Sequence, residues 1–131
     1  MRRYGIIFAG ALICAPLGRA EASPGKVLGS VRAPGGCPTG LTYHRGLLWV
    51  ADHKADRLFA VDPKTGKVVR SFLSPGHRPA GLAAGKTLLW HADVATEKIY
   101  GLDYRTGHSL VTVDSPVRAP VALARAGRHL W

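Results

Sequence analysis

Residues 47–52 read LLWVAD, and residues 88–93 read LLWHAD. The two segments are 41 residues apart, and shifting the chain by that distance aligns residues 25–65 with residues 66–106 without a gap, with 16 of 41 positions identical. A third copy begins at Gly107 and runs to Trp131, so the sequence holds about 2.6 repeats. A period of 20 to 50 residues indicates one structural unit that is used several times.

Each repeat is predicted to contain four short strands separated by turns. The strands are rich in Val, Leu, Trp and Phe and are bounded by Gly, Pro or Asp, which is typical of β-structure. In the first copy they span residues 39–44, 47–52, 57–62 and 67–73. The turn DPKTG at residues 62–66 combines a proline, an Asp that can accept a backbone hydrogen bond, and a glycine for the left-handed position. No segment shows a clean 3.6-residue spacing, so a helical repeat is disfavoured.

Four strands in about 40 residues is the unit of a β-propeller blade. We therefore expect an all-β fold made of four-stranded antiparallel blades, with units at residues 25–65, 66–106 and 107–131, the last of them truncated. Closed propellers have about 4 to 8 blades, which would require roughly 160 to 330 residues. We expect this chain to be the N-terminal portion of a longer protein, with residues 25–32 aligned to the outermost strand of the unit.

The pattern PTGL, LLWVAD and RLFAVDPKTGKVV, repeated as PAGL, LLWHAD and KIYGLDYRTGHSL, resembles a known group of bacterial β-propellers. This group includes the YVTN/YncE-like, NHL-like, SMP-30/gluconolactonase-like and streptogramin-lyase-like proteins. The resemblance covers the chain from Gly25 onward. It implies the propeller architecture, while the activities of these relatives differ.

The N-terminus has the composition of a secretory signal peptide. Residues 1–22 have a basic start, an apolar run of about 15 residues and a small-x-small site at residues 20–22, with cleavage before Ser23. The apolar run is shorter than the roughly 20 residues that span a bilayer as a helix. We expect a secreted or periplasmic protein whose residues 23–131 form the partial propeller and carry no transmembrane anchor. An uncleaved anchor and a lipoprotein modified at Cys14 are the alternatives.

The predicted mature chain is strongly basic. It carries 15 basic and 7 acidic side chains, because the signal peptide removes three arginines and one glutamate. Such a charge favours anionic surfaces, such as phospholipid head groups or acidic polysaccharide, and would also bind nucleic acid weakly and without sequence specificity. The basic residues are scattered and never form a run of four, so a soluble protein with an alkaline pI is the simpler interpretation.

Several conspicuous side chains recur at one point of every repeat. An acid or a large aromatic ring at a fixed position in each unit is best explained by a need of the unit itself, such as tying down a loop or packing between sheets. We therefore interpret these positions as structural rather than catalytic. They are Asp52, Asp93, Asp62 and Asp103 among the acids and Trp49, Trp90 and Trp131 among the aromatics.

Function is expected where the repeat is broken. His44, His53 and His91 align with residues of other types and lie on or beside inner strands, so they are candidates to line a central channel. Their spacing matches no metal-binding motif, and the sequence gives no catalytic residue and no cofactor. Gluconolactonase-like propellers hold a divalent metal with Glu and Asn, whereas this chain has no Asn or Gln and Glu97 is its only mature glutamate.

These observations favour an exported binding or interaction module whose partner is a protein or a small molecule. The alternative is part of a metal-dependent lactonase-like or streptogramin-lyase-like enzyme. There the resemblance implies a divalent metal and a site completed by further blades. A truncated product without activity is the third interpretation. Basic loops gathered on one rim would favour a binder of polyanions, and a channel-lining set of Glu, Asn and His would favour the enzyme.

Overall fold

The computed structural model describes residues 24–131, and the predicted signal peptide at residues 1–22 lies outside them. The described residues contain ten strands and no helix, which confirms the expected all-β fold, and they provide no helix that could cross a membrane. The strands all lie in one compact unit, residues 31–131. Residues 25–32, which align with the outermost strand of the repeat, form no strand.

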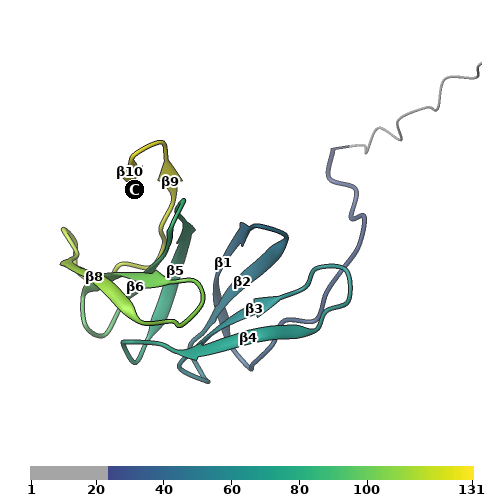
Figure 1. Ribbon diagram of the computed structural model, residues 1–131, viewed down its shortest axis with the longest axis horizontal. Coiled ribbons are helices and arrows are strands. Elements are labelled where there is room, and N and C mark those ends of the chain that lie inside the picture. The colour runs from purple at the N-terminus through teal and green to yellow at the C-terminus, as the bar shows by residue number, and fades with distance from the viewer. Residues whose placement is uncertain (1–23) are drawn as a thin grey trace, which may run out of the picture. The chain divides into compact units, whose positions relative to one another are not determined.

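The strands form two four-stranded antiparallel sheets and a short hairpin, each in chain order (Figure 1). The first sheet comprises β1 (Pro38–His44), β2 (Leu47–Asp52), β3 (Arg57–Val61) and β4 (Val68–Leu73). The second comprises β5 (Pro79–Ala84), β6 (Leu88–Asp93), β7 (Lys98–Asp103) and β8 (Ser109–Asp114). The hairpin joins β9 (Arg125–Ala126) to β10 (His129–Leu130) and begins a third unit. This open and incomplete set of blades is the arrangement that the repeat predicts.

The innermost strands of the two sheets, β1 and β5, lie side by side and run in the same direction. Thr39 Oγ1 donates to the carbonyl of Pro79 over 2.7 Å, and further along the strands the N–H of Ala84 donates to Thr42 Oγ1 over 3.2 Å. The approach is so close that a Cβ atom on Gly40 would collide with the carbonyl oxygen of Ala80. Gly81 meets the backbone of Ala122 in the same way. The repeated PTGL and PAGL segments therefore owe their glycine to backbone contact between neighbouring units.

The core lies between the two sheets. Trp49 is 2% exposed. Its ring lies 5.9 Å from the ring of Phe72 in its own sheet and 5.4 Å from that of Tyr104 in the β7–β8 turn of the other unit. The opposing face of the second sheet supplies apolar side chains that are almost completely buried. They are Leu82, Leu89, Tyr100 and Leu102. Each sheet has two apolar faces, so it needs a neighbour on both sides.

Equivalent positions show what the neighbour contributes. Leu82 faces the first sheet and is 3% exposed, whereas Leu41, at the same position of the first repeat, is 64% exposed. Trp49 is buried against the second sheet, whereas Trp90, its equivalent, is only half-buried beside the β9–β10 hairpin. Repeat units of this kind gain most of their stability from their interfaces.

The first prediction compares these two tryptophans. Trp49→Ala is expected to lower the free energy of unfolding by about 3–5 kcal/mol, because it empties a closed interface, and Trp90→Ala by less than half as much. Urea unfolding of the wild-type chain and the two variants, followed by circular dichroism, measures the difference. Equal losses would contradict the proposed asymmetry of the two interfaces.

Candidate functional site

Asp52 and Asp93 each clamp two loops at one end of their sheet. Asp52 accepts hydrogen bonds from the backbone N–H groups of Cys37, at 2.6 Å, and Ala55, at 2.7 Å. Asp93 repeats this with the N–H groups of Arg78, at 2.7 Å, and Thr96, at 2.8 Å. Both carboxylates are 0% exposed. Their oxygens are used by backbone donors, so the geometry supports the structural interpretation of this position.

The environment of Asp93 keeps it ionised. Burial opposes the charge, but the hydrogen bonds from Thr96 and Arg78 outweigh that cost and hold the pKa of Asp93 below its usual value. At the other end of the sheets, Asp62 and Asp103 accept hydrogen bonds within their own turns, from Lys64 N–H at 2.8 Å and Arg105 N–H at 2.9 Å. The bond from Lys64 lowers the pKa of Asp62, and a bond from the N–H of Thr106 together with that from Arg105 lowers the pKa of Asp103.

His91 is buried in the second sheet. It is 0% exposed, its Nε2 lies 2.9 Å from Ser74 Oγ, and its ring stacks on Tyr100 with centroids 5.9 Å apart. Its Nδ1 has no hydrogen-bond partner. Burial disfavours the imidazolium and lowers the pKa of His91 to about 4, although the nearby Asp93 acts in the opposite direction.

The other two candidate histidines lie elsewhere. His44 ends β1, and its ring stacks on that of Tyr104 with centroids 4.3 Å apart and planes at 7°. Burial and the neighbouring Arg45 lower the pKa of His44. His53 lines a cavity of about 270 Å³ at the opposite end of β1, with Thr39 and Pro79. The structure therefore does not bring the three histidines together, and no three His, Cys, Asp or Glu residues gather within residues 24–131 to hold a metal ion.

Positive charge gathered at one end of the blades is the distinctive surface feature. Because all sheets are antiparallel and their inner strands run in the same direction, five turns lie at one end of the blades, and each carries an exposed basic residue. We call this end the basic rim, defined by Arg45, Lys64, Lys86, Arg105 and Arg128. The rim turns also contain two carboxylates, Asp62 and Asp103, so the rim keeps a net positive charge, whereas the opposite end holds more carboxylates beside Lys54, Arg78 and Arg118. Within the described residues the only ion pair, Lys98 to Asp114, does not involve the rim.

Two pockets open at the basic rim, one at each seam between successive units. The first seam pocket has a volume of about 290 Å³, and its lining consists of His44, Arg45, Leu47, Trp49, Arg70, Tyr104 and Arg105. Arg70 Nη1 donates to the carbonyl of Tyr104 over 2.8 Å, and the Tyr104 hydroxyl donates to the carbonyl of Gly85 over 3.0 Å. Burial raises the pKa of the Tyr104 hydroxyl, although the nearby Arg125 and Arg45 act to lower it. The hydroxyl therefore stays protonated.

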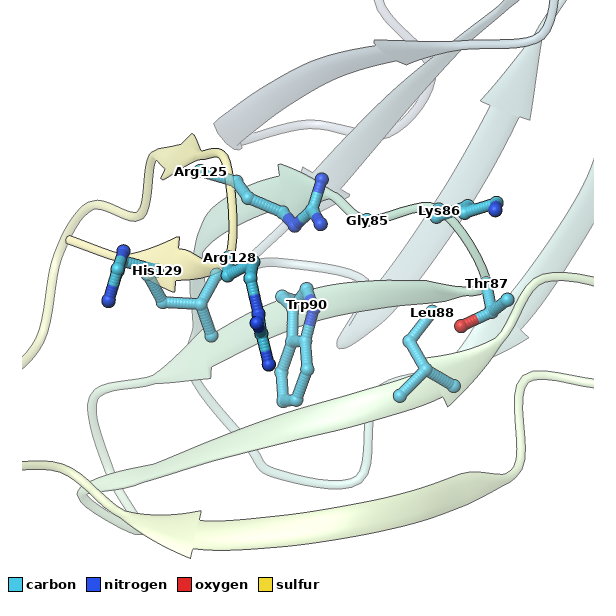
Figure 2. Close-up of a pocket in the computed structure, with 9 residues that line it drawn as sticks. Gly85, Lys86, Thr87, Leu88, Trp90, Arg125, Arg128 and His129 are labelled. Carbon is cyan, nitrogen blue, oxygen red and sulfur yellow. The ribbon is translucent and has the colours of Figure 1, made fainter.

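The second seam pocket lies between the second sheet and the β9–β10 hairpin and has a volume of about 460 Å³ (Figure 2). Residues 85, 86, 88 and 90 of its lining are the repeat equivalents of residues 44, 45, 47 and 49. Thr87, Arg125, Arg128, His129 and Leu130 complete it. No carboxylate of residues 24–131 lines either seam pocket. Both pockets therefore combine aromatic rings with basic side chains.

Sequence reasoning missed the basic rim and both seam pockets. The rim has one basic residue per turn and never a run, so a search for charge clusters does not find it. A signal was nevertheless present, because Arg45 and Lys86 occupy the same position of the repeat, as do Lys64 and Arg105. Reading the charges in phase with the repeat would have placed four of the five cations at one end of the blades.

No protein-family model matches this chain, and no curated protein matches it. Solved structures do. The glutaminyl cyclase of Myxococcus xanthus has a TM-score of 0.60 at 16% identity, over 75% of this chain and 49% of that one. Hydrazine synthase of Kuenenia stuttgartiensis has a TM-score of 0.60 at 15% identity, over 76% of this chain and 29% of that one. Apo AztD of Citrobacter koseri has a TM-score of 0.55 at 16% identity, over 66% of this chain and 26% of that one.

These similarities establish the fold. The glutaminyl cyclase and AztD are β-propeller-like, so the chain belongs structurally with partial β-propellers. It spans about half of the cyclase and about a quarter of AztD. Identities this low carry no activity across, and they do not distinguish the YVTN, NHL and SMP-30 group from other propellers.

The second prediction concerns the buried histidine. Between pH 6.5, where an unfolded histidine titrates, and about pH 4, the unfolded chain binds one more proton than the folded one at His91. The free energy of unfolding is therefore expected to fall by about 3 kcal/mol as the pH decreases through this window. Asp93 has a lowered pKa, so its contribution to the free energy of unfolding is lost only at lower pH, below about 3.9.

Urea unfolding at several pH values between about 7 and 4 tests this dependence, with two variants. His91→Gln is neutral and able to bond Ser74, so it should flatten the slope. His108→Gln, at an exposed position, should leave the slope as it is in the wild-type chain. An unchanged slope in His91→Gln would show that other groups cause it.

Proposed function

We propose that this chain is part of an exported β-propeller that binds acidic polysaccharide along its basic rim. The observation that supports the proposal is the position of the charge. Each of the five turns at one end carries an exposed Lys or Arg, and none of these residues has an ion-pair partner among residues 24–131. Charge of one sign gathered on one surface attracts polyanions, and the attraction depends on salt.

A linear polymer fits the rim better than a membrane does. The rim cations are spaced along successive turns, so an extended chain of carboxylates can contact several of them in order. Amphipathic segments that insert into a bilayer surface present Trp, Phe or Leu as well as basic residues. The five turns offer no exposed large apolar residue, because Tyr104, their one aromatic residue, packs on His44.

The enzymatic alternative is a metal-dependent lactonase-like or streptogramin-lyase-like propeller. Within residues 24–131 no three His, Cys, Asp or Glu residues gather to hold a metal ion, so such an enzyme would need ligands from other residues. A binding role needs no such group. Export rests on the signal-like composition of residues 1–22, and membership of the YVTN, NHL and SMP-30 group rests on the repeat motifs. Both remain part of the proposal.

The third prediction tests the rim with charge variants. The triple variant Arg45→Ala, Lys64→Ala, Arg105→Ala should bind alginate, a polymer of uronic acids, about tenfold more weakly, since each exposed charge contributes up to about 1 kcal/mol. Binding is measured by calorimetry at salt concentrations from about 0.01 M to about 1 M, where screening becomes nearly complete. The affinity of the wild-type chain should fall steeply across this range.

The matched control removes the same charge from the opposite end, with Lys54→Ala, Arg78→Ala and Arg118→Ala, all at exposed positions. The control should bind alginate almost as well as the wild-type chain. Equal losses in the two triple variants would overturn the role of the rim. Preference for anionic phospholipid vesicles over alginate would replace the polysaccharide with a membrane surface.

A further inference from the structure

Three side chains that break the repeat meet in the first seam pocket. They are His44, Arg70 and Tyr104. Their counterparts in the other four-stranded unit are Gly85, Val111 and Pro63. Both units that form this pocket contain all four of their strands. The chemistry of the pocket is therefore a property of this one seam and is not supplied by the repeat.

Arg70 joins the two units across the seam. Its Nη1 donates to the carbonyl of Tyr104 over 2.8 Å, and the ring of Tyr104 stacks on that of His44 with centroids 4.3 Å apart. This hydrogen bond uses one of the five N–H groups of the guanidinium and fixes its position, which leaves the others for a ligand. Arg70 is exposed, so a ligand can reach it. The pocket therefore contains a guanidinium that is held in place before anything binds.

Arg45 and Arg105 bring two more guanidinium groups to the same pocket. None of the three arginines forms an ion pair within residues 24–131, and no carboxylate of this range lines the pocket. Like charges around one pocket repel each other, and a bound anion offsets that repulsion. The backbone of Arg45 has a φ of 47°, in the left-handed region where Asn, Asp or Gly is usual, so the turn accepts strain to place an arginine there.

Two buried polar atoms of residues that line this pocket have no hydrogen-bond partner. They are Nε1 of Trp49, which is 2% exposed, and Nε2 of His44. Buried polar groups nearly always have a partner, so two orphaned groups at one pocket point to a ligand there. The volume of about 290 Å³ lies just below the usual range of about 300 to 1,000 Å³ for small-molecule sites. The pocket therefore suits a single acid group rather than an oligosaccharide.

We propose that the first seam pocket holds one carboxylate of the acidic polysaccharide, bound by the guanidinium of Arg70 with Arg45 and Arg105 beside it. The inference rests on the proposed function and deepens it, because it assigns one specific contact on a surface that otherwise attracts the polymer by charge. A guanidinium matches a carboxylate through two parallel hydrogen bonds, which the ammonium group of a lysine does not offer. The shape of the cation is therefore expected to matter as well as its charge.

The fourth prediction changes the shape and keeps the charge. Arg70→Lys should weaken the binding of an alginate trisaccharide roughly tenfold, because the paired hydrogen bonds to the carboxylate are lost. The matched control, Arg118→Lys, makes the same exchange at an exposed position of the opposite end and should bind as the wild-type chain does. Calorimetry measures the three affinities. Equal affinities of Arg70→Lys and the wild-type chain would overturn the pocket.

A second measurement locates the trisaccharide. The indole N–H resonance of Trp49 is assigned by elimination with Trp90→Phe and Trp131→Phe. The alginate trisaccharide should shift this resonance in the wild-type chain, and less so in Arg70→Lys at the same concentration. A neutral glucose trisaccharide should leave it in place. An equal shift with the neutral sugar would contradict a carboxylate site, and an equal shift with acetate, at the same concentration of carboxylate, would contradict the assignment to the polymer.

The folding of Arg70→Lys is checked by circular dichroism, because Arg70 also joins the two units. If this variant fails to fold, Arg105→Lys decides, since it conserves the charge of another guanidinium of the pocket and should also weaken trisaccharide binding.

The two proposals fail in different ways. If the wild-type chain binds alginate and the charge-conserving variants bind it equally well, the rim stands and the specific pocket is wrong. If the wild-type chain does not bind alginate at all, the proposed function is wrong, and the pocket proposal falls with it.

Discussion

The close approach of the innermost strands is the constraint on which the rest of the structure depends. Gly40 and Gly81 let the backbones of neighbouring units touch, and the hydrogen bonds from Thr39 to Pro79 and from Ala84 to Thr42 hold β1 and β5 in the same direction. Every second turn therefore falls at the same end of the blades. The basic rim follows from this common direction, because residues far apart in the chain are placed at one level.

The sequence was sufficient to predict the blades because their determinants are local and repeated. The predicted strand at residues 47–52 is β2 without change, and the predicted strand at residues 67–73 differs from β4 by one residue. Turn chemistry at Asp62 and Asp103 defines the ends of β3 and β7, and alternating apolar residues define the faces. What repeats in the sequence also repeats in the structure.

The candidate site was harder to predict, because it depends on which residues meet between units. Tyr104 has no counterpart in the first repeat, where Pro63 occupies its position, and nothing in the sequence shows that its ring stacks on His44. His91 breaks the repeat where Val50 stands, and no pattern in the sequence indicates that Ser74 Oγ would lie 2.9 Å from its Nε2. A broken repeat marks a place of interest, but only the packing shows its partners.

The Asp clamps have a consequence for how freely this protein can change during evolution. Asp52 and Asp93 bind their loops through backbone N–H groups, which every residue except proline possesses. Cys37 and Arg78, which share no side-chain property, therefore serve the same carboxylate position equally well. Mutations can accumulate at the donor positions without loosening the blade, so new surface chemistry can arise there. Gly35 and Gly76 in the same loops are constrained, because a Cβ atom on either would collide with the carboxylate.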